Sequence, residues 1–224
     1  MPFCGMSGSS QIVDLRNLLA ERYPPAAASP RSRLVTGLPA LDQAGGGGLP
    51  KSAITELSSP HLSSGSASVI HALLQNASRE GYFLALIDGR DSFDPSAWAA
   101  RGPSRLRNLL WIRCRKAVAA VKAADLLLRD GNFPLVILDL VLNSMEELRQ
   151  IPQTNWYRLQ RLVEATPIAF LILTRRDMIS SAQLKLSLES AWKLDDLEQS
   201  DLAARLKILV TRAHAGIQTI AGAG

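Results

Sequence analysis

Residues 56–74, ELSSPHLSSGSASVIHALL, have the outline of a phosphate-binding loop that leads into a helix. Such a loop offers its backbone N–H groups to an anion at the start of the helix. A loop that works on nucleotides closes with Gly-Lys-Ser/Thr, where the Lys neutralises phosphate charge and the hydroxyl binds Mg²⁺. Here Gly65 is followed by Ser66 and Ala67, so the sequence has the outline of the loop without its charged and metal-binding groups.

Other residue types that could perform chemistry are sparse and scattered. The three histidines are His61, His71 and His214, and the chain contains no HExxH or GxSxG motif. Cys4 and Cys114 lie far apart and outside any CxxC pattern, which argues against a disulfide framework or a zinc site. We therefore expect no metal site and no catalytic residue of these types.

The composition indicates a globular protein whose core is built mainly from aliphatic side chains. Hydrophobic residues make up 47% of the 224 residues and aromatic residues only 5%, which suits one domain with an appendage or two very small domains. A net charge of +5 permits contact with nucleic acid or an acidic partner without establishing either. The start has no secretory pattern, and the apolar runs 134–142 and 167–174 are too short to span a bilayer. We expect a cytoplasmic protein with no membrane contact, and association with the nucleoid stays open.

The chain divides into a tethered N-terminal segment and a core. In residues 10–22, Ile12, Leu15 and Leu19 form one apolar helical stripe, and residues 23–33 are rich in Pro, Ala and Ser. Residues 1–33 are thus predicted to be an amphipathic helix with a linker, and residues 34–224 a core domain with a short C-terminal tail.

The core is predicted to be an α/β domain with a mostly parallel twisted sheet and helices on both faces. Apolar strands are expected at residues 53–57, 82–88, 109–114, 134–140 and 168–174. Helices are expected after the quoted loop to about residue 79, at 117–130 and at 156–165. Strands that are apolar throughout and alternate with helices indicate a sheet covered on both faces. Residues 183–189 and 205–211 alternate apolar with polar side chains, which predicts a C-terminal extension of half-exposed, antiparallel strands.

Several segments resemble the RecA family in the same order along the chain. TGLPALDQAGGGGLPKSAITEL (36–57) resembles the start of the RecA core, and FLALIDGRDSFDP (83–95) resembles its second strand and the turn that follows. FPLVILDL (133–140) stands where the Walker B strand belongs. The resemblance runs from about residue 34 to 213 and implies a RecA-like fold.

The resemblance also implies that the phosphate loop is degenerate. It comprises Pro60, Ser63, Ser64, Gly65, Ser66 and Ala67. Pro60 takes the first glycine position and has no N–H to offer. Ser66 stands in the Lys position and Ala67 in the Ser/Thr position; shifting the register by one brings Ser68 to the metal role but supplies no Lys. The serine-rich turn is expected to cap the helix first, with weak anion binding without turnover left open.

The acid that polarises water in RecA-like enzymes is also replaced. Arg90 holds the matching position, and a guanidinium cannot act as a base. Asp91 is adjacent but is expected to point elsewhere, so Asp139 in the Walker B place is the relic of the site. We expect no nucleotide cofactor, no catalytic residue and no ATP hydrolysis.

The DNA-binding loops of the RecA family have short counterparts here. They would lie within residues 141–167 and 175–182, so filament-type DNA binding is not expected. Arg175 and Arg176 could still contact phosphate, and a solvated loop is the alternative. A DNA-binding module would instead use the basic residues Arg101, Arg105, Arg107, Arg113, Arg115 and Lys116.

One group within the RecA relatives fits the whole pattern. LRNLLAERYP (15–24), TGLPALD (36–42) and GGGGLPKSAITEL (45–57) are similar to segments of ImuA-like proteins. This resemblance implies a non-catalytic adaptor of the SOS-induced translesion mutasome that binds RecA, an ImuB-type polymerase subunit, or both. The alternatives are a DNA-binding regulator of recombination, a SulA-like cell-division inhibitor and, as the least expected, an active ATPase.

The apolar stripe Ile12, Leu15 and Leu19 is the expected partner-binding element. It could dock on a partner or on another copy of the chain, or it could fold back on its own core. Composition does not separate these outcomes.

Overall fold

The computed structural model describes residues 32–61, 64–96, 106–190 and 205–214. The predictions for the tethered helix, including Ile12, Leu15 and Leu19, and those for Ser63, Arg101 and Arg105 lie outside the described residues. The strands are β1 (Arg33–Leu34), β2 (Leu49–Pro50), β3 (Ala53–Ser58), β4 (Leu84–Asp88), β5 (Leu109–Arg113), β6 (Leu135–Asp139), β7 (Ala169–Thr174), β8 (Leu184–Leu188) and β9 (Ile208–Ala213). The helices are α2 (Pro39–Ala44), α3 (Ser66–Glu80), α5 (Ala117–Asp130), α6 (Met145–Arg149) and α7 (Gln153–Glu164).

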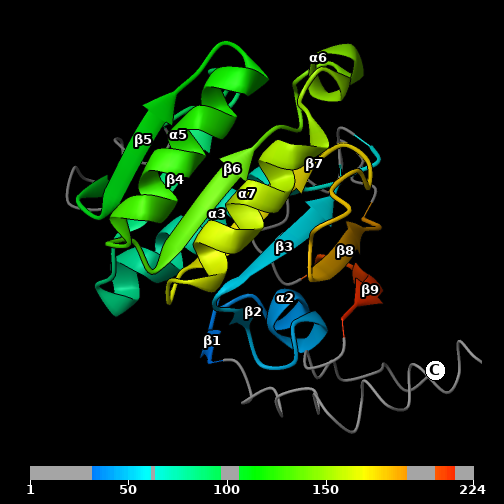
Figure 1. Cartoon of the computed structure of the whole chain (residues 1–224). Helices are drawn as coiled ribbons and strands as arrows, with labels where there is room; N and C mark the ends of the chain where they lie inside the picture. The colour runs from blue at the N-terminus through cyan, green and yellow to red at the C-terminus, as the bar shows by residue number, and fades with distance from the viewer. Residues whose placement is uncertain (1–31, 62–63, 97–105, 191–204, 215–224) are drawn as a thin grey trace, which may run out of the picture. The chain divides into compact units, whose positions relative to one another are not determined.

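A seven-stranded sheet in the order β5-β4-β6-β7-β3-β8-β9 forms the centre of the described part of the chain. Every pair from β5 to β8 is parallel, and only β8 and β9 pair antiparallel. Figure 1 shows α5 and α7 side by side over one face of the sheet, with α3 behind the other face. The predicted α/β fold, with helices on both faces and an antiparallel strand pair at the C-terminal end, is confirmed.

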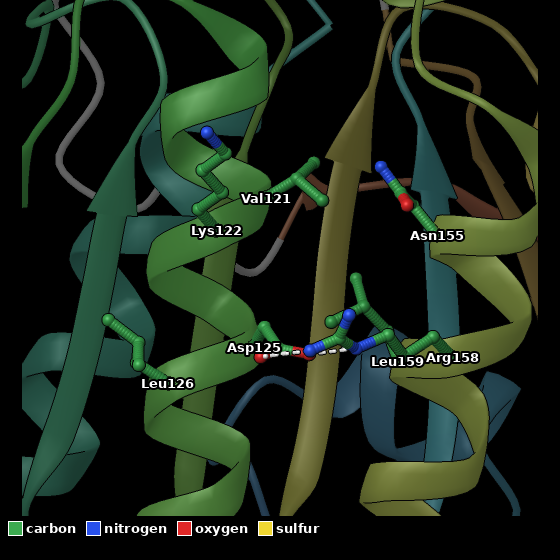
Figure 2. A pocket seen from close by; sticks show the side chains of 7 residues that line it. All are labelled: Val121, Lys122, Asp125, Leu126, Asn155, Arg158 and Leu159. Atoms are coloured by element: carbon green, nitrogen blue, oxygen red, sulfur yellow. Dashed lines mark hydrogen bonds and ion pairs between the residues drawn. The ribbon is translucent and has the colours of Figure 1, made fainter.

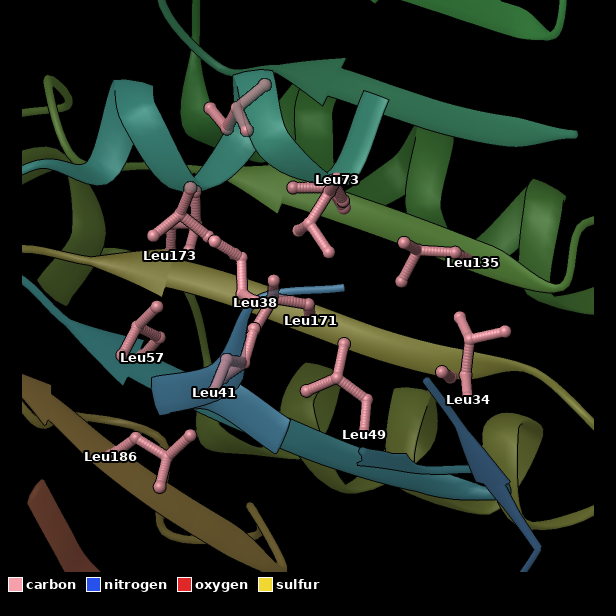
Figure 3. Packing of buried hydrophobic residues seen from close by; sticks show 14 of the residues in the cluster. Leu34, Leu38, Leu41, Leu49, Leu57, Leu73, Leu135, Leu171, Leu173 and Leu186 are labelled. Atoms are coloured by element: carbon pink, nitrogen blue, oxygen red, sulfur yellow. The ribbon is translucent and has the colours of Figure 1, made fainter. Parts of the chain in front are cut away.

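Each face of the sheet has its own hydrophobic core. On one face, leucines of the strands pack against α2 and α3; Figure 3 shows Leu41 of α2, its N-cap residue Leu38 and Leu73 of α3 among the leucines of the sheet. On the other face, α5, α6 and α7 cover the strands, and Trp156 and Phe170 are the largest fully buried side chains there. The alternate residues of each parallel strand serve the two cores, which explains why these strands are apolar throughout.

The glycine-rich segment closes a small hairpin of β1 and β2 around α2. Asp42 accepts hydrogen bonds from the N–H and hydroxyl of Thr36, at 2.8 and 2.7 Å, and fixes the turn before α2. Gly48 has a φ of +131°, and a Cβ there would lie 2.4 Å from the carbonyl oxygen of Leu34. Only glycine allows the two backbones to approach this closely.

Two predictions about individual strands were wrong. β8 was expected to be half-exposed, but it is fully buried, because it lies between β3, to which it is parallel, and β9, with which it forms the predicted antiparallel pair. Its polar side chains are buried because Lys185 pairs with Glu56 and the hydroxyl of Ser187 donates to Glu189 at 2.6 Å. β5 was expected to be buried throughout, but it is an edge strand with a mixed burial pattern.

Candidate functional site

The degenerate loop, the end of β6 and the turn after β4 line a pocket of about 280 Å³ at the carboxyl edge of the sheet. In parallel α/β sheets ligands bind at this edge. The pocket is lined by Ser66, Ala67, Ile70, His71, Ser92, Phe93, Asp94, Asp139, Val141 and Leu142. The structure therefore brings the predicted Ser66, Ala67 and Asp139 together.

Within the loop, Ser64 is already engaged. Its hydroxyl donates to the carbonyl oxygen of His61 at 2.8 Å and accepts from the His61 N–H at 3.2 Å, and the serine is fully buried. Pro60 and His61 are exposed. Ser64 thus closes the turn and is not directed to a ligand.

The start of α3 differs from the prediction of a serine cap. The N-cap is Gly65 in the left-handed conformation, with a φ of 96°, and no side chain makes a capping hydrogen bond to this helix among the described residues. Glycine permits this conformation because it has no Cβ. The C-terminal end agrees with the predicted end at about residue 79: α3 ends at Glu80, and its C-cap Gly81 is also left-handed.

The charged groups that line the pocket are acidic. Asp94 and Asp139 contribute carboxylates, while none of the described residues that line the pocket is Lys or Arg. Ser66 and Ala67 lie at the first two positions of α3, where the resemblance would require a Lys and a hydroxyl. Because a triphosphate needs compensating positive charge, this lining does not fit Mg²⁺-nucleotide.

Asp139 has an unusual environment for a carboxyl group. Burial raises its pKa to about 6, and the nearby charge of Asp88 contributes in the same direction. The N–H of Val141, 3.0 Å from Oδ1, opposes the shift. The Asp139 carboxyl group is therefore half-protonated near pH 6 and mostly ionised at neutral pH.

Asp88, at the end of β4, organises the turn that follows and was not singled out from the sequence. Its buried carboxylate accepts hydrogen bonds from the N–H groups of Ser92 and Phe93, both at 2.7 Å, and of Arg90 at 3.2 Å. Asp at the head of a Gly-containing turn is a common Asx arrangement, so the segment DGRDS carried this signal.

The side chains of Arg90 and Asp91 point away from the pocket. Arg90 is exposed, and its Nη1 donates to the carbonyl oxygen of Arg115 at 3.4 Å. Asp91 has a φ of 56° and forms a bidentate pair with Arg113 on β5, at 2.6 and 2.9 Å. Neither residue lines the pocket, so neither is placed to act on a group bound there.

Arg175 and Arg176 follow β7 and are exposed, but the loop that carries them is anchored. The carboxylate of Glu56 accepts from the N–H groups of Met178 and Ile179, at 2.9 and 3.2 Å. It also accepts from the hydroxyl of Thr174 at 3.1 Å. These hydrogen bonds hold the backbone of the loop in place, so it does not form a long mobile DNA-binding loop.

Lys185 completes this anchor from β8. Its ammonium group lies 3.2 Å from Glu56 Oε2 and also pairs with Asp177. Sequence reasoning missed both buried charges. The signal for Glu56 was its position in an otherwise apolar strand. Lys185 was missed because the alternation of apolar and polar residues in β8 indicated an exposed face.

The described residues contain no group of three or more His, Cys, Asp or Glu side chains that could hold a metal ion. None of their helices is long and apolar enough to cross a membrane.

The mostly parallel sheet, the strand-to-helix loop before α3 and Asp139 at the end of β6 are the features of a RecA-like α/β core. The RecA N-terminal domain family matches residues 28–149, more than half of the chain, and the chain belongs to this family.

Curated relatives include RecA proteins from several bacteria. The RecA of a Picosynechococcus species is 32% identical over 120 residues, which cover 54% of this chain and 34% of the relative. The RecA of Clavibacter michiganensis subsp. michiganensis is 35% identical over 114 residues, or 50% of this chain and 31% of the relative. The RecA of Leifsonia xyli subsp. xyli is 36% identical over 107 residues, or 47% and 29%. The matched part thus spans about a third of the length of these relatives.

Proposed function

We propose that this chain is a non-catalytic RecA-like accessory protein of SOS-induced translesion synthesis. In this role it binds RecA, an ImuB-type polymerase subunit, or both, and works without ATP hydrolysis. The RecA-like fold supports a place in DNA repair or recombination, and the similarity of residues 15–24 and 36–57 to ImuA-like proteins supports the finer assignment.

The observation that carries the proposal is the chemistry of the pocket beside α3. Its described lining combines apolar side chains, Ser66, Ser92 and His71 with the carboxyl groups of Asp94 and Asp139, and it contains no Lys or Arg. The turned-away Arg90 leaves the pocket without a base at the matching position. The sheet is well packed although the site lacks the charges that bind nucleotide. This combination supports a role for the fold as a surface that binds other proteins.

The first test is direct binding of the purified full chain to RecA and to an ImuB-type subunit from the same organism. We expect saturable binding to at least one of them at low and at physiological salt. Binding to neither would contradict the proposal.

The second test measures Mg²⁺-ATP binding and turnover. We expect none above background, in wild type and in the Asp139→Ala variant alike. Saturable turnover that disappears in Asp139→Ala would overturn the non-catalytic assignment.

The N-terminal segment belongs to the same proposal. We expect that deleting residues 1–30 weakens binding to a partner or changes the oligomer size, because the stripe Ile12, Leu15 and Leu19 is apolar and is followed by a linker. Unchanged partner affinity and unchanged oligomer size would show that this segment is not a docking element.

A DNA-binding regulator is the second candidate, favoured by the exposed neighbours Arg175 and Arg176. Salt-dependent binding of single-stranded DNA that is weakened by Arg175→Ala and Arg176→Ala together would favour it. Under the adaptor proposal that double variant leaves partner affinity unchanged.

A further inference from the structure

The outer surface of the α5–α7 layer is hollowed between the two helices. A pocket of about 390 Å³ lies there, and Figure 2 shows Lys122 and Leu126 projecting from α5 and Arg158 and Leu159 from α7. A second hollow of about 570 Å³ shares Arg158 and continues along α7. We call these two hollows together the α5–α7 groove.

The groove has an apolar floor, and exposed apolar side chains stand on its rim. Val121 and Leu159 are buried at its floor. Leu126 is 68% exposed, and Tyr157, on the α7 side, is 49% exposed. Val118, at 40% exposure, lies on the stripe of α5 that also carries Leu126. Single exposed apolar residues are common on proteins, but several beside one groove indicate a contact surface.

The charge of the groove is positive. Lys122, Arg158 and Arg161 line it, and Asp125 is its single lining carboxylate among the described residues. That carboxylate is already shared: it pairs with Arg158 at 2.7 Å across the groove and with Arg129 at 2.9 Å.

The two remaining cations are uncompensated. Within the described part of the chain, Lys122 and Arg161 form no ion pair, and both are exposed. An apolar floor with an unpaired cation at each of the two hollows, Lys122 at the first and Arg161 at the second, is complementary to an apolar stripe flanked by carboxylates.

We propose that the α5–α7 groove binds a helix of a partner protein whose apolar stripe is flanked by Asp or Glu. An amphipathic helix laid between two helices buries its apolar side chains in the floor and brings its flanking charges to the rim. The proposal goes beyond the function proposed above, because it concerns a surface remote from the degenerate loop and does not depend on which protein supplies the helix.

Two other occupants fit less well. Residues 10–22 of this chain carry two acidic and two basic residues, Asp14, Arg16, Glu21 and Arg22, so they offer no net negative charge to the rim. Nucleic acid would meet the cations but would leave Leu126, Tyr157 and the floor without apolar partners.

The test is selection from a displayed library of helical peptides on the immobilised full chain, with no partner assumed. We expect enriched peptides to carry an apolar i, i+3, i+4, i+7 stripe flanked by Asp or Glu. The affinity of the synthesised enriched peptides for the chain should fall about tenfold or more in Leu126→Asp and in the double variant Lys122→Glu, Arg161→Glu.

The matched control is Val35→Asp, which places the same charge on another exposed apolar position, 61% exposed and outside the groove. Its peptide affinity should equal that of wild type, and circular dichroism and thermal unfolding should match for all variants. Enriched peptides without acidic flanks, or peptides that bind the groove variants and wild type equally, would overturn the proposal. A single-stranded DNA or self-association signal that the groove variants abolish, in the absence of enriched acidic helical peptides, would also overturn it.

Discussion

The ammonium group of Lys185 lies 3.2 Å from Oε2 of Glu56 between two parallel strands, and both side chains are almost fully buried. The pair joins β8 to β3, and through Met178 and Ile179 it holds the loop after β7. A buried pair of this kind adds little stability relative to apolar residues, but breaking it leaves an uncompensated charge.

We predict that Lys185→Met lowers the free energy of unfolding by about 3–5 kcal/mol, because Glu56 is then buried without its cation. Urea denaturation followed by circular dichroism measures the change. The control is Lys122→Met on exposed α5, with an expected change within about 0.5 kcal/mol. Adding Glu56→Gln to Lys185→Met should recover part of the loss; a double variant as unstable as the sum of the singles would contradict the coupling.

Asp139→Asn should stabilise the protein at neutral pH. The pKa of Asp139 is raised from 3.8 to about 6 in the fold, so the fold favours the protonated form. The contribution of this group to stability is present below about pH 4 and is lost as the pH rises through 6. The asparagine keeps an acceptor for the Val141 N–H but carries no charge.

The stability difference between Asp139→Asn and wild type should therefore depend on pH. We expect the variant to be more stable by about 2 kcal/mol at pH 7.5 and equal to wild type near pH 4. Thermal unfolding across this range checks the prediction. A difference that does not change with pH would mean that the carboxyl group titrates normally.

Gly89→Ala should destabilise the fold for steric reasons. A Cβ at this position would lie 2.5 Å from Oδ1 of Asn143 and 2.7 Å from the carbonyl oxygen of Asp139, to which the Gly89 N–H donates at 2.9 Å. Because the second neighbour is backbone, we expect a loss of about 1–3 kcal/mol in unfolding free energy. Combining it with Asn143→Ala should not restore stability, since the backbone contact persists. Full recovery in that double variant would assign the cost to Asn143.

Glu147 of α6 should prove to be a cap for α5. Its Oε1 accepts from the Ala117 N–H at the start of α5, and Oε2 accepts from Asn143 at 3.1 Å. Glu147→Ala is expected to cost about 1–2 kcal/mol and Glu147→Gln less, because the glutamine oxygen can still accept. Glu146→Ala, in the same short helix and exposed, is the control and should be near neutral. Equal effects of the two alanine variants would rule out the cap.

The sequence predicted most of the described sheet because hydrophobic patterning decides where buried parallel strands and their covering helices lie. The helix predicted at 117–130 is found as Ala117–Asp130, since its apolar stripe and the following Gly131 agree. The alternation in β8 misled because both polar side chains are buried with a partner: Lys185 pairs with Glu56, on a strand distant in sequence, and Ser187 donates to Glu189, two residues further along the chain.

The candidate site was predictable in position but not in geometry. Collinear matching brought Ser66, Ala67 and Asp139 to one pocket, as the structure shows. The direction of the Arg90 side chain and the engagement of Ser64 with His61 depend on local backbone conformation, which residue types do not specify. The α5–α7 groove combines side chains from two helices separated in sequence, so it became visible only with the fold.

The anchoring of the loop after β7 has a kinetic and an entropic consequence. To release residues 177–179, the protein must expose a carboxylate and an ammonium group that the sheet interior now pairs, so opening resembles local unfolding more than a thermal fluctuation. A molecule that binds Arg175 and Arg176 therefore binds a preformed surface. Its association does not carry the entropic cost of ordering a flexible segment.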